Sequence, residues 1–263
     1  MATPSPPPGG YPRRGRLPRT TSSPGAFTSI RLPIVLRRLF KPPTLDFETA
    51  VWEICYLLVA PKKVYRQIYY HVKTKNTWAR DDPSFMILLS LFLVLSAVAW
   101  GVAYAPGFGP VVKLMFNMVL VDFLGMGVIV STVLWAVAGR FLKQANARGV
   151  MNIGAEGTLE WAYCFDVHCN GFLVIWLFLY VIQYVLLPII TLENWFAMFL
   201  GNTLYLAAFS YYFVITYLGY SALPFLEHTE YLLAPLLVFV VVFLVSLSGW
   251  NIAQHVVRLY FGA

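Results

Sequence analysis

The sequence predicts an all-α, polytopic membrane protein with five transmembrane helices and an interfacial amphipathic helix before the first of them. Three observations lead to this class. Apolar stretches long enough to cross a bilayer fill most of the chain after Pro83. Hydrophobic residues make up 59% of the chain and charged residues only 12%, whereas soluble domains carry about 25% charged residues. Fourteen of the nineteen Lys and Arg residues precede Pro83. A soluble globular protein is therefore excluded.

The expected spans together form a transmembrane domain at 84–263. Each has about the twenty residues that cross a hydrocarbon core roughly 30 Å thick. Four of them contain no charged residue, and the second contains one, Asp122. The five spans are 85–104, 114–138, 172–190, 195–218 and 231–249.

The distribution of basic residues predicts the orientation in the membrane. Residues 1–83 hold fourteen basic and five acidic residues, whereas the remainder holds five and seven. The cytoplasmic side attracts Lys and Arg, and the first span usually sets the orientation. We therefore expect a cytoplasmic N-terminus and, after five crossings, a lumenal C-terminus. The 140–170 loop is then cytoplasmic, which its basic residues suit, while Lys113 and Arg258 fall on the opposite side.

Residues 1–33 are expected to form a disordered, Pro- and Arg-rich cytoplasmic arm. They contain eight prolines and no acidic residue, and such a segment cannot bury enough apolar surface to fold. No apolar core of a secretory signal peptide is present. The composition also resembles an organellar transit peptide, although the prolines oppose the amphipathic helix of a mitochondrial presequence.

Residues 34–83 are expected to form a cytoplasmic, interfacial helical segment. Its apolar residues follow helical spacing up to Pro61, and Lys62, Lys63 and Arg66 come directly after it. One interpretation places this helix in the headgroup region of the bilayer. The other packs it against the transmembrane helices without lipid contact, and both can hold together. The apolar stripe consists of Phe47, Ala50, Val51, Ile54, Leu57 and Leu58.

The motif WARDDP at 78–83 stands immediately before the first span. Pro83 suits the first turn of a helix, and Asp81 and Asp82 suit the positive end of its dipole. Arg80 can pair with either carboxylate. The motif is therefore interpreted as a helix start with an ion pair, and alternatively as a polar cluster that binds a partner or an ion.

A second polar group precedes the third span, where Thr158 can cap a helix that runs directly into the membrane. On a helix, Asp166 and Asn170 share one face, whereas His168 points elsewhere. No tetrahedral metal site assembles from this segment alone, so we expect a polar helix–helix seam and no bound metal. The residues of metal-ligand type weighed here are Cys164, Asp166, His168 and Cys169.

Asp122 is the acid predicted to lie inside the membrane. A central Asp costs about 2.5–3.5 kcal/mol on insertion scales, so it should face the interior of the bundle. We expect Gln183, Asn202 or a tyrosine of the fourth span as its partner. The carboxyl group either stabilises helix contacts or serves a transport site; because no second deep charge accompanies it, the structural role is favoured.

Several further patterns concern packing and covalent chemistry. Ala97/Gly101, Gly127/Ser131 and Ala197/Gly201 are pairs of small residues that permit close helix contact. The apolar connection that follows the fourth span, with helix-ending signals at Gly219 and Pro224, should lie at the interface or tuck into the bundle. Three cysteines (Cys55, Cys164 and Cys169) fall in expected cytoplasmic segments, which argues against a disulfide framework.

No catalytic signature is present in the sequence. It contains no phosphate-cradling glycine loop, nucleophile elbow, HExxH motif or pair of carboxylates at catalytic spacing. We therefore expect no enzyme activity, no catalytic residue and no cofactor.

Three motifs resemble the Unc-fifty family: VYRQIYY…TWARDDPSF (64–85), EWAYCFDVHCNGF (160–172) and GNTLYL…YYFVITYLGYSALPFL (201–226). The resemblance implies a five-span protein of the Golgi and endomembrane system, similar in architecture to Yip-type trafficking proteins. It also implies binding of an Arf guanine-nucleotide exchange factor and support for the transport or assembly of membrane cargo such as receptors. Six residues match the family's motifs without an assigned chemistry: Arg80, Asp81, Asp82, Asp166, His168 and Asn170.

The leading functional hypothesis is thus a Golgi membrane adaptor whose partners are the lipid bilayer, an Arf exchange factor and anionic lipid. A channel or transporter that uses Asp122 is the alternative from another class. A lipid-handling enzyme would require Asp81, Asp82, Asp166 and His168 to converge. The basic arm attracts any polyanion, but it lacks interleaved aromatic residues, so specific RNA binding is not expected.

Overall fold

The computed structural model describes residues 45–75, 77–104, 107–143 and 158–261. These ranges form helices and short connections without a strand, and an isolated bridge pairs Lys143 with Leu226. By its contacts the chain divides into Met1–Pro33 and Ile34–Ala263. The predicted arm at 1–33 lies outside the described residues, as do 34–44 and 144–157.

Five of the described helices are long and apolar enough to cross a membrane, so the predicted all-α, five-span class is confirmed. The first is α4 (Ser84–Tyr104), close to its predicted range. The second and third begin six and eleven residues earlier than predicted. The five ranges are Ser84–Tyr104, Phe108–Leu142, Trp161–Ile190, Trp195–Ser221 and Thr229–Ser246.

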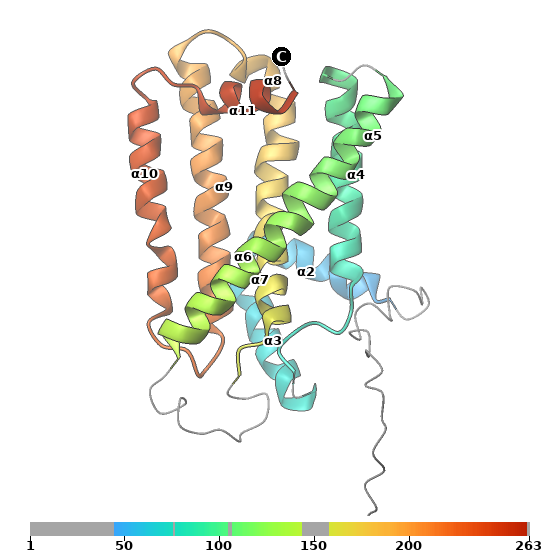
Figure 1. Cartoon of the computed structure of the whole chain (residues 1–263), viewed down its shortest axis with the longest axis vertical. Helices are drawn as coiled ribbons and strands as arrows, with labels where there is room; N and C mark the ends of the chain where they lie inside the picture. The colour runs from blue at the N-terminus through green and yellow to red at the C-terminus, as the bar shows by residue number, and fades with distance from the viewer. Residues whose placement is uncertain (1–44, 76, 105–106, 144–157, 262–263) are drawn as a thin grey trace, which may run out of the picture. The chain divides into compact units, whose positions relative to one another are not determined.

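The second span is one continuous helix built from α5 (Phe108–Phe116), η2 (Asn117–Gly125), α6 (Met126–Val137) and η3 (Ala138–Leu142). At 1.5 Å per residue it is about 50 Å long, well beyond a hydrocarbon core of about 30 Å, so it must be inclined or must project from the bilayer. Figure 1 shows this helix crossing the other spans diagonally. The stretches η2 and η3 are π-helical, so their wider turns change which residues face the bundle.

The third span consists of α7 (Trp161–Ile175), η6 (Trp176–Ile182) and α8 (Gln183–Ile190). It is one continuous helix from Trp161 to Ile190, so the helix before the predicted third span runs directly into it, as predicted. The predicted cap is wrong, because Glu160 and not Thr158 occupies the N-cap position, and the side chain of Glu160 forms no cap hydrogen bond. Trp176 and Trp100 bind this span to the first one through indole hydrogen bonds to Ser96 and the Tyr180 carbonyl.

The fourth span is α9 (Trp195–Ser221), capped by Asn194, whose side chain accepts a hydrogen bond from the Ala197 amide at 2.7 Å. The helix passes Gly219, so that residue does not end it as predicted. The connection that follows tucks into the bundle with Leu223 and Phe225 buried, as predicted. The fifth span then begins with η7 (Thr229–Leu233) and continues as α10 (Pro235–Ser246).

Before the first span, α2 (Phe47–Val59) and α3 (Pro61–Lys75) meet at a corner that Pro61 opens. Three residues of the predicted stripe, Ala50, Ile54 and Leu57, are buried in the bundle core. The helix α2 packs on α4 and α7, and α3 packs on α9. The interpretation in which this segment packs against the transmembrane helices is therefore confirmed, whereas its contact with lipid stays a prediction.

A helix that the sequence did not lead us to expect, α11 (Ile252–Phe261), follows the fifth span. Asn202 on α9 holds its start: the amide group donates to Ser246 Oγ and to the Trp250 carbonyl, and Oδ1 accepts from the Ile252 amide at 2.8 Å. Figure 1 shows α11 across the end of the bundle opposite α2 and α3.

The predicted pairs of small residues lie at helix contacts. A Cβ atom on Gly127 would lie 2.9 Å from both the His168 and Phe165 rings of α7. One on Gly201 would lie 2.9 Å from Ala253 of α11. The absence of a side chain at these positions is what lets the helices approach.

Candidate functional site

The segment 77–83, which contains the WARDDP motif, is fastened to the start of α7 through its backbone. The amides of Trp78 and Ala79 donate to the two carboxylate oxygens of Glu160, at 3.3 and 3.1 Å. The amide of Arg80 donates to Asp166 Oδ2 at 2.7 Å. Two acidic side chains of one helix end thus fix the path of the chain into the first span.

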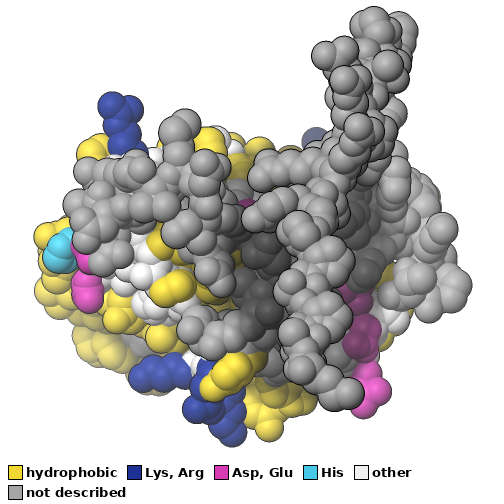
Figure 2. Space-filling view, turned by 90° about the horizontal axis from the view of Figure 1, so that it is seen from below, with side chains coloured by type: hydrophobic (Ala, Val, Ile, Leu, Met, Phe, Trp, Pro, Cys, Tyr) yellow, Lys and Arg dark blue, Asp and Glu magenta, His cyan; other side chains and the backbone are white. Residues whose placement is uncertain are grey.

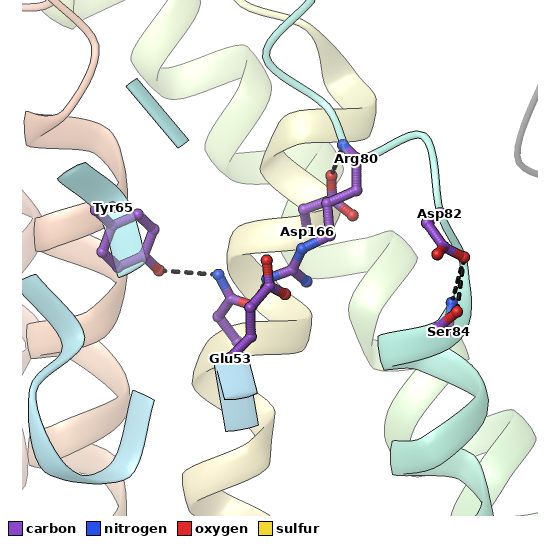
Figure 3. Close-up of polar contacts among 7 residues, drawn as sticks. Glu53, Tyr65, Arg80, Asp82, Ser84 and Asp166 are labelled. Atoms are coloured by element: carbon purple, nitrogen blue, oxygen red, sulfur yellow. Dashed lines mark hydrogen bonds and ion pairs between the residues drawn. The ribbon is translucent and has the colours of Figure 1, made fainter. Parts of the chain in front are cut away.

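The side chain of Arg80 extends between three helices (Figure 3). Its Nη2 forms an ion pair with Glu53 of α2 at 3.0 Å and donates to Asn170 Oδ1 of α7 at 2.6 Å. Its guanidinium carbon lies 4.4 Å from the centre of the Phe85 ring of α4, a cation–π geometry. With 14% and 17% of their side chains exposed, Arg80 and Glu53 are largely removed from water.

Neighbouring carboxylates stabilise the positive charge of Arg80. Burial opposes the charged form of Arg80, but the carboxylates of Glu53 and Asp166 outweigh that effect, so its pKa lies above the ordinary value. Asn170 Nδ2 donates to the Tyr65 hydroxyl of α3 at 3.3 Å, and burial raises the pKa of Tyr65 well above its usual range. We call Glu53, Tyr65, Arg80, Asp166 and Asn170 the Arg80 cluster.

Asp82 joins the starts of two helices. Its Oδ1 accepts from the amide and the hydroxyl of Ser84, at 3.1 and 2.7 Å, and so caps α4. Its Oδ2 accepts from the Asp46 amide at 2.7 Å, just before α2. Asp81 is half-buried beside it. The predicted helix start is therefore present, while the acid that pairs with Arg80 is Glu53, which the sequence did not single out.

His168 lies on another face of α7 from Asp166 and Asn170, as helical geometry predicted. It is buried, and its Nδ1 lies 3.0 Å from the Tyr212 hydroxyl of α9. Phenylalanine rings surround it: Phe123, Phe165 and Phe172. Asp82 and His168 therefore contact different residues and do not converge as a lipid-handling enzyme would require.

The cysteine-containing part of α7 offers no metal centre in the described ranges, where no group of three or more His, Cys, Asp and Glu residues is placed to hold an ion. Cys164 and Cys169 are buried free thiols, and Cys55 is an exposed one.

Asp122 forms a separate polar site within the spans. Its Oδ2 accepts hydrogen bonds from the hydroxyls of Tyr180 in η6, at 2.9 Å, and Tyr260 in α11, at 2.6 Å. Asn117 donates to the same Tyr260 hydroxyl at 2.9 Å. These contacts differ from the partners predicted from the sequence, Gln183, Asn202 or a tyrosine of the fourth span. Asp122 instead connects the second span, the third span and the C-terminal helix.

Comparison with known proteins identifies the family of this chain. Residues 35–261 match the UNC-50 family. The chain belongs to this family. The "Protein GMH1 homolog" of Schizosaccharomyces pombe is 43% identical over 225 residues, covering 86% of this chain and 95% of the relative. "Protein GMH1" of Saccharomyces cerevisiae is 42% identical over 238 residues, covering 85% and 84%. The human "Protein unc-50 homolog" is 39% identical over 227 residues, covering 86% and 85%. No solved structure matches.

Membership of the UNC-50 family, together with the five apolar helices, makes the chain a multi-pass membrane protein. Within this fold, sequence reasoning missed the roles of Glu53, Glu160, Tyr65 and Tyr260. Glu53 left a signal, because it is an acid flanked by the apolar residues of the predicted stripe. Glu160 and Tyr65 lie inside the motifs that carry the family resemblance. No sequence pattern indicated the role of Tyr260, because its helix, α11, was not expected.

Proposed function

We propose that this UNC-50 family member is a non-enzymatic Golgi membrane protein of vesicular traffic. Its cytoplasmic face, formed by the N-terminal helices, recruits or regulates an Arf guanine-nucleotide exchange factor and so supports the transport or assembly of membrane cargo such as receptors. The family resemblance implies the location and the partner. In this proposal the N-terminus is cytoplasmic and the C-terminus lumenal.

The observation that carries the proposal is the attachment of α2, α3 and residues 77–83 to the bundle. The Arg80 cluster, Glu160 and Asp82 fix α2 and the WARDDP segment to α4 and α7. The hydroxyl of Tyr211 on α9 lies 3.0 Å from the carbonyls of Leu57 and Leu58, at the end of α2. A folded surface of this kind is preorganised, and preorganisation reduces the entropy lost when a soluble partner binds.

The same contacts favour a structural role for the polar residues over a reaction. Asp166 and Asp82 accept hydrogen bonds from backbone amides, and one oxygen of Asp122 accepts hydrogen bonds from two tyrosine hydroxyls. Carboxyl groups used in this way hold helices together. An adaptor needs that stability more than it needs a reactive group.

The orientation is tested with a reporter fused after Ala263. We expect a glycosylation acceptor there to be modified, and a protease-sensitive tag to be protected in sealed vesicles, because five crossings place the two ends on opposite sides. The same reporter placed before Met1 serves as the control and should be cleaved. Cleavage of the C-terminal tag from the cytosolic side would overturn the proposed topology.

The partner surface is tested by co-precipitating the exchange factor with two variants of the full-length chain. We expect deletion of residues 1–33 to leave Golgi localisation and binding largely intact, because specificity resides in the ordered segment. We expect Asp81→Ala with Asp82→Ala to weaken binding, since Asp82 supports the starts of α2 and α4; removal of a cap typically costs about 1 kcal/mol.

Expression level and thermal stability of each variant are measured alongside. If the double variant loses binding only as much as it loses folded protein, the role of Asp82 is to hold the starts of the two helices in place. If the arm deletion abolishes binding while the double variant binds normally, the ordered segment is not the partner surface.

A further inference from the structure

The corner between α2 and α3 carries exposed apolar and basic residues that the packing of the bundle does not explain. On α2 an exposed ridge runs beside the buried face, and on α3 three basic side chains point outward or lie over a ring. We call these residues the α2–α3 corner: Phe47, Val51, Cys55 and Val59 of the ridge, and Lys62, Lys63 and Arg66 of the basic group.

The ridge is a continuous line on one helix face. Its members are spaced four residues apart, a spacing that places side chains one above another on a helix. Phe47, Val51 and Val59 are 42%, 49% and 85% exposed, and Cys55 is also exposed. The buried face of α2, with Ala50, Ile54 and Leu57, lies beside the ridge, so the apolar surface of the helix extends beyond the part that protein covers.

The positive charge of the basic group is not neutralised by ion pairs within the described part of the chain. Lys62 and Arg66 are exposed, lie four residues apart on one face of α3, and form no ion pair with a described carboxylate. Like charges at this spacing repel, and cations in the first turn of a helix oppose its dipole. Lys63 Nζ lies 5.1 Å from the centre of the Tyr56 ring, which packs against Trp52 at 4.3 Å.

The position of the corner relative to the spans identifies what it faces. The helix α2 packs on α4, whose outward side chains are exposed and apolar, as lipid-facing residues are (Leu91, Leu95, Val98 and Val102). The helix α3 packs on α9 near its last turn, where Tyr65 approaches Gly219. The corner therefore lies at the end of the bundle, where a span enters the bilayer and another leaves it.

We propose that the α2–α3 corner binds the headgroups of anionic phospholipids in the leaflet at this end of the bundle. The ridge lies at the boundary of the acyl chains, and Lys62, Lys63 and Arg66 contact headgroup phosphates. An amphipathic helix with apolar residues on one side and Lys or Arg beside them has this mode of binding. Figure 2 shows Lys and Arg side chains gathered beside hydrophobic ones at one edge of this face.

This inference concerns lipid selectivity and does not depend on the proposed exchange-factor role. A soluble polyanion would use the basic group alone and leave the ridge exposed to water. The exposed apolar ridge beside the basic group favours lipid, because binding at the bilayer surface buries the ridge and pairs the basic group with phosphates at the same time.

The test uses the purified full-length chain in nanodiscs of phosphatidylcholine that contain a minor fraction of phosphatidylserine or of a phosphatidylinositol phosphate. The lipids that remain bound after exchange into detergent are identified by native mass spectrometry. We expect Lys62→Gln with Arg66→Gln to reduce the enrichment of anionic lipid about tenfold, since each basic residue near the surface contributes to the attraction. The effect should shrink as salt screens the charges.

The matched control removes the same charge at the other end of the bundle. Lys113 of α5 and Arg258 of α11 are exposed, and Lys113→Gln with Arg258→Gln should leave the enrichment unchanged. Both pairs of residues are on the surface, so both variants are expected to fold, and thermal unfolding of each is compared with the parent. Equal enrichment in the two variants would overturn the proposal.

A second arm separates lipid from other polyanions. Val51→Asn with Val59→Asn should lower lipid enrichment while the basic group remains, because it removes the apolar part of the ridge. Short RNA and the water-soluble inositol phosphate headgroup are offered to the parent protein in phosphatidylcholine alone. The same binding is then measured in both variants. If RNA or the inositol phosphate binds, the Lys62→Gln, Arg66→Gln variant loses that binding and the ridge variant retains it, the corner is a general polyanion site and the proposal is overturned.

Discussion

Arg80→Met is expected to destabilise the protein by about 3–5 kcal/mol, the range found when one partner of a buried ion pair is removed. The substitution keeps the length and apolar stem of the side chain but deletes the charge. Glu53 then loses its ion pair, and Asn170 Oδ1 loses a donor 2.6 Å away. Asp166 keeps the Arg80 backbone amide but loses the nearby positive charge that offsets its burial. Thermal unfolding in detergent and the monodisperse fraction in size-exclusion chromatography measure the loss.

The matched control is Arg66→Met, which removes a basic residue from exposed positions on α3 where no described carboxylate pairs with it. It should unfold close to the parent temperature. Adding Glu53→Gln to Arg80→Met should recover part of the loss, because a neutral amide no longer leaves a charge without a partner. Equal unfolding temperatures for Arg80→Met and Arg66→Met would show that the Arg80 cluster does not stabilise the fold.

The class and the number of spans were predictable because lipid imposes one simple rule, a run of apolar residues of sufficient length. The ends of the spans were not. The second span starts at Phe108 and includes Lys113, and the third includes Asp166, His168 and Asn170. A hydropathy pattern stops at such residues, whereas the fold accepts polar side chains that are satisfied by neighbouring helices or lie at a helix end.

The candidate site was predictable to the extent that one helix determines it. Helical spacing placed Asp166 and Asn170 on a common face, and both contact Arg80. The partner of Arg80 was not predictable in the same way, because Glu53 belongs to a different helix and the pairing depends on how α2 crosses α4 and α7. Local periodicity carries no information about such crossings.

Asp122 illustrates a second limit. It lies in the π-helical stretch η2, and its partner Tyr180 lies in another, η6. A π-helical turn shifts every later side chain relative to a regular α-helix, so the sequence placed Asp122 towards the bundle interior but could not identify the side chains that it contacts there. The Trp100 indole donates to the Tyr180 carbonyl at 2.9 Å, a contact that helps to hold the third span in this form.

Asp122→Leu is expected to release α11 from the bundle. Tyr180 and Tyr260 both donate to Asp122 Oδ2, and a hydroxyl left without an acceptor away from water costs about 1–3 kcal/mol. Asp122→Asn should preserve the contacts, because the amide oxygen has two lone pairs that can accept both hydroxyls. Leucine is also easier to insert into a membrane than aspartate, so the leucine variant should still insert while its C-terminal helix detaches.

The measurement follows α11 directly. Val257 faces the core of the bundle, with 9% of its surface exposed, so a cysteine placed there reports on detachment. In a Cys55→Ser background, Val257→Cys should react slowly with a polar maleimide in the parent and in Asp122→Asn, and at least several-fold faster in Asp122→Leu. Tyr260→Phe removes one of the two hydrogen bonds and should give an intermediate rate. Equal rates in all four proteins would show that Asp122 does not hold α11. Loss of cellular function in Asp122→Asn, with normal folding, localisation and a slow maleimide reaction, would instead assign Asp122 a transport role, because that variant removes the ionisable group and keeps the hydrogen bonds.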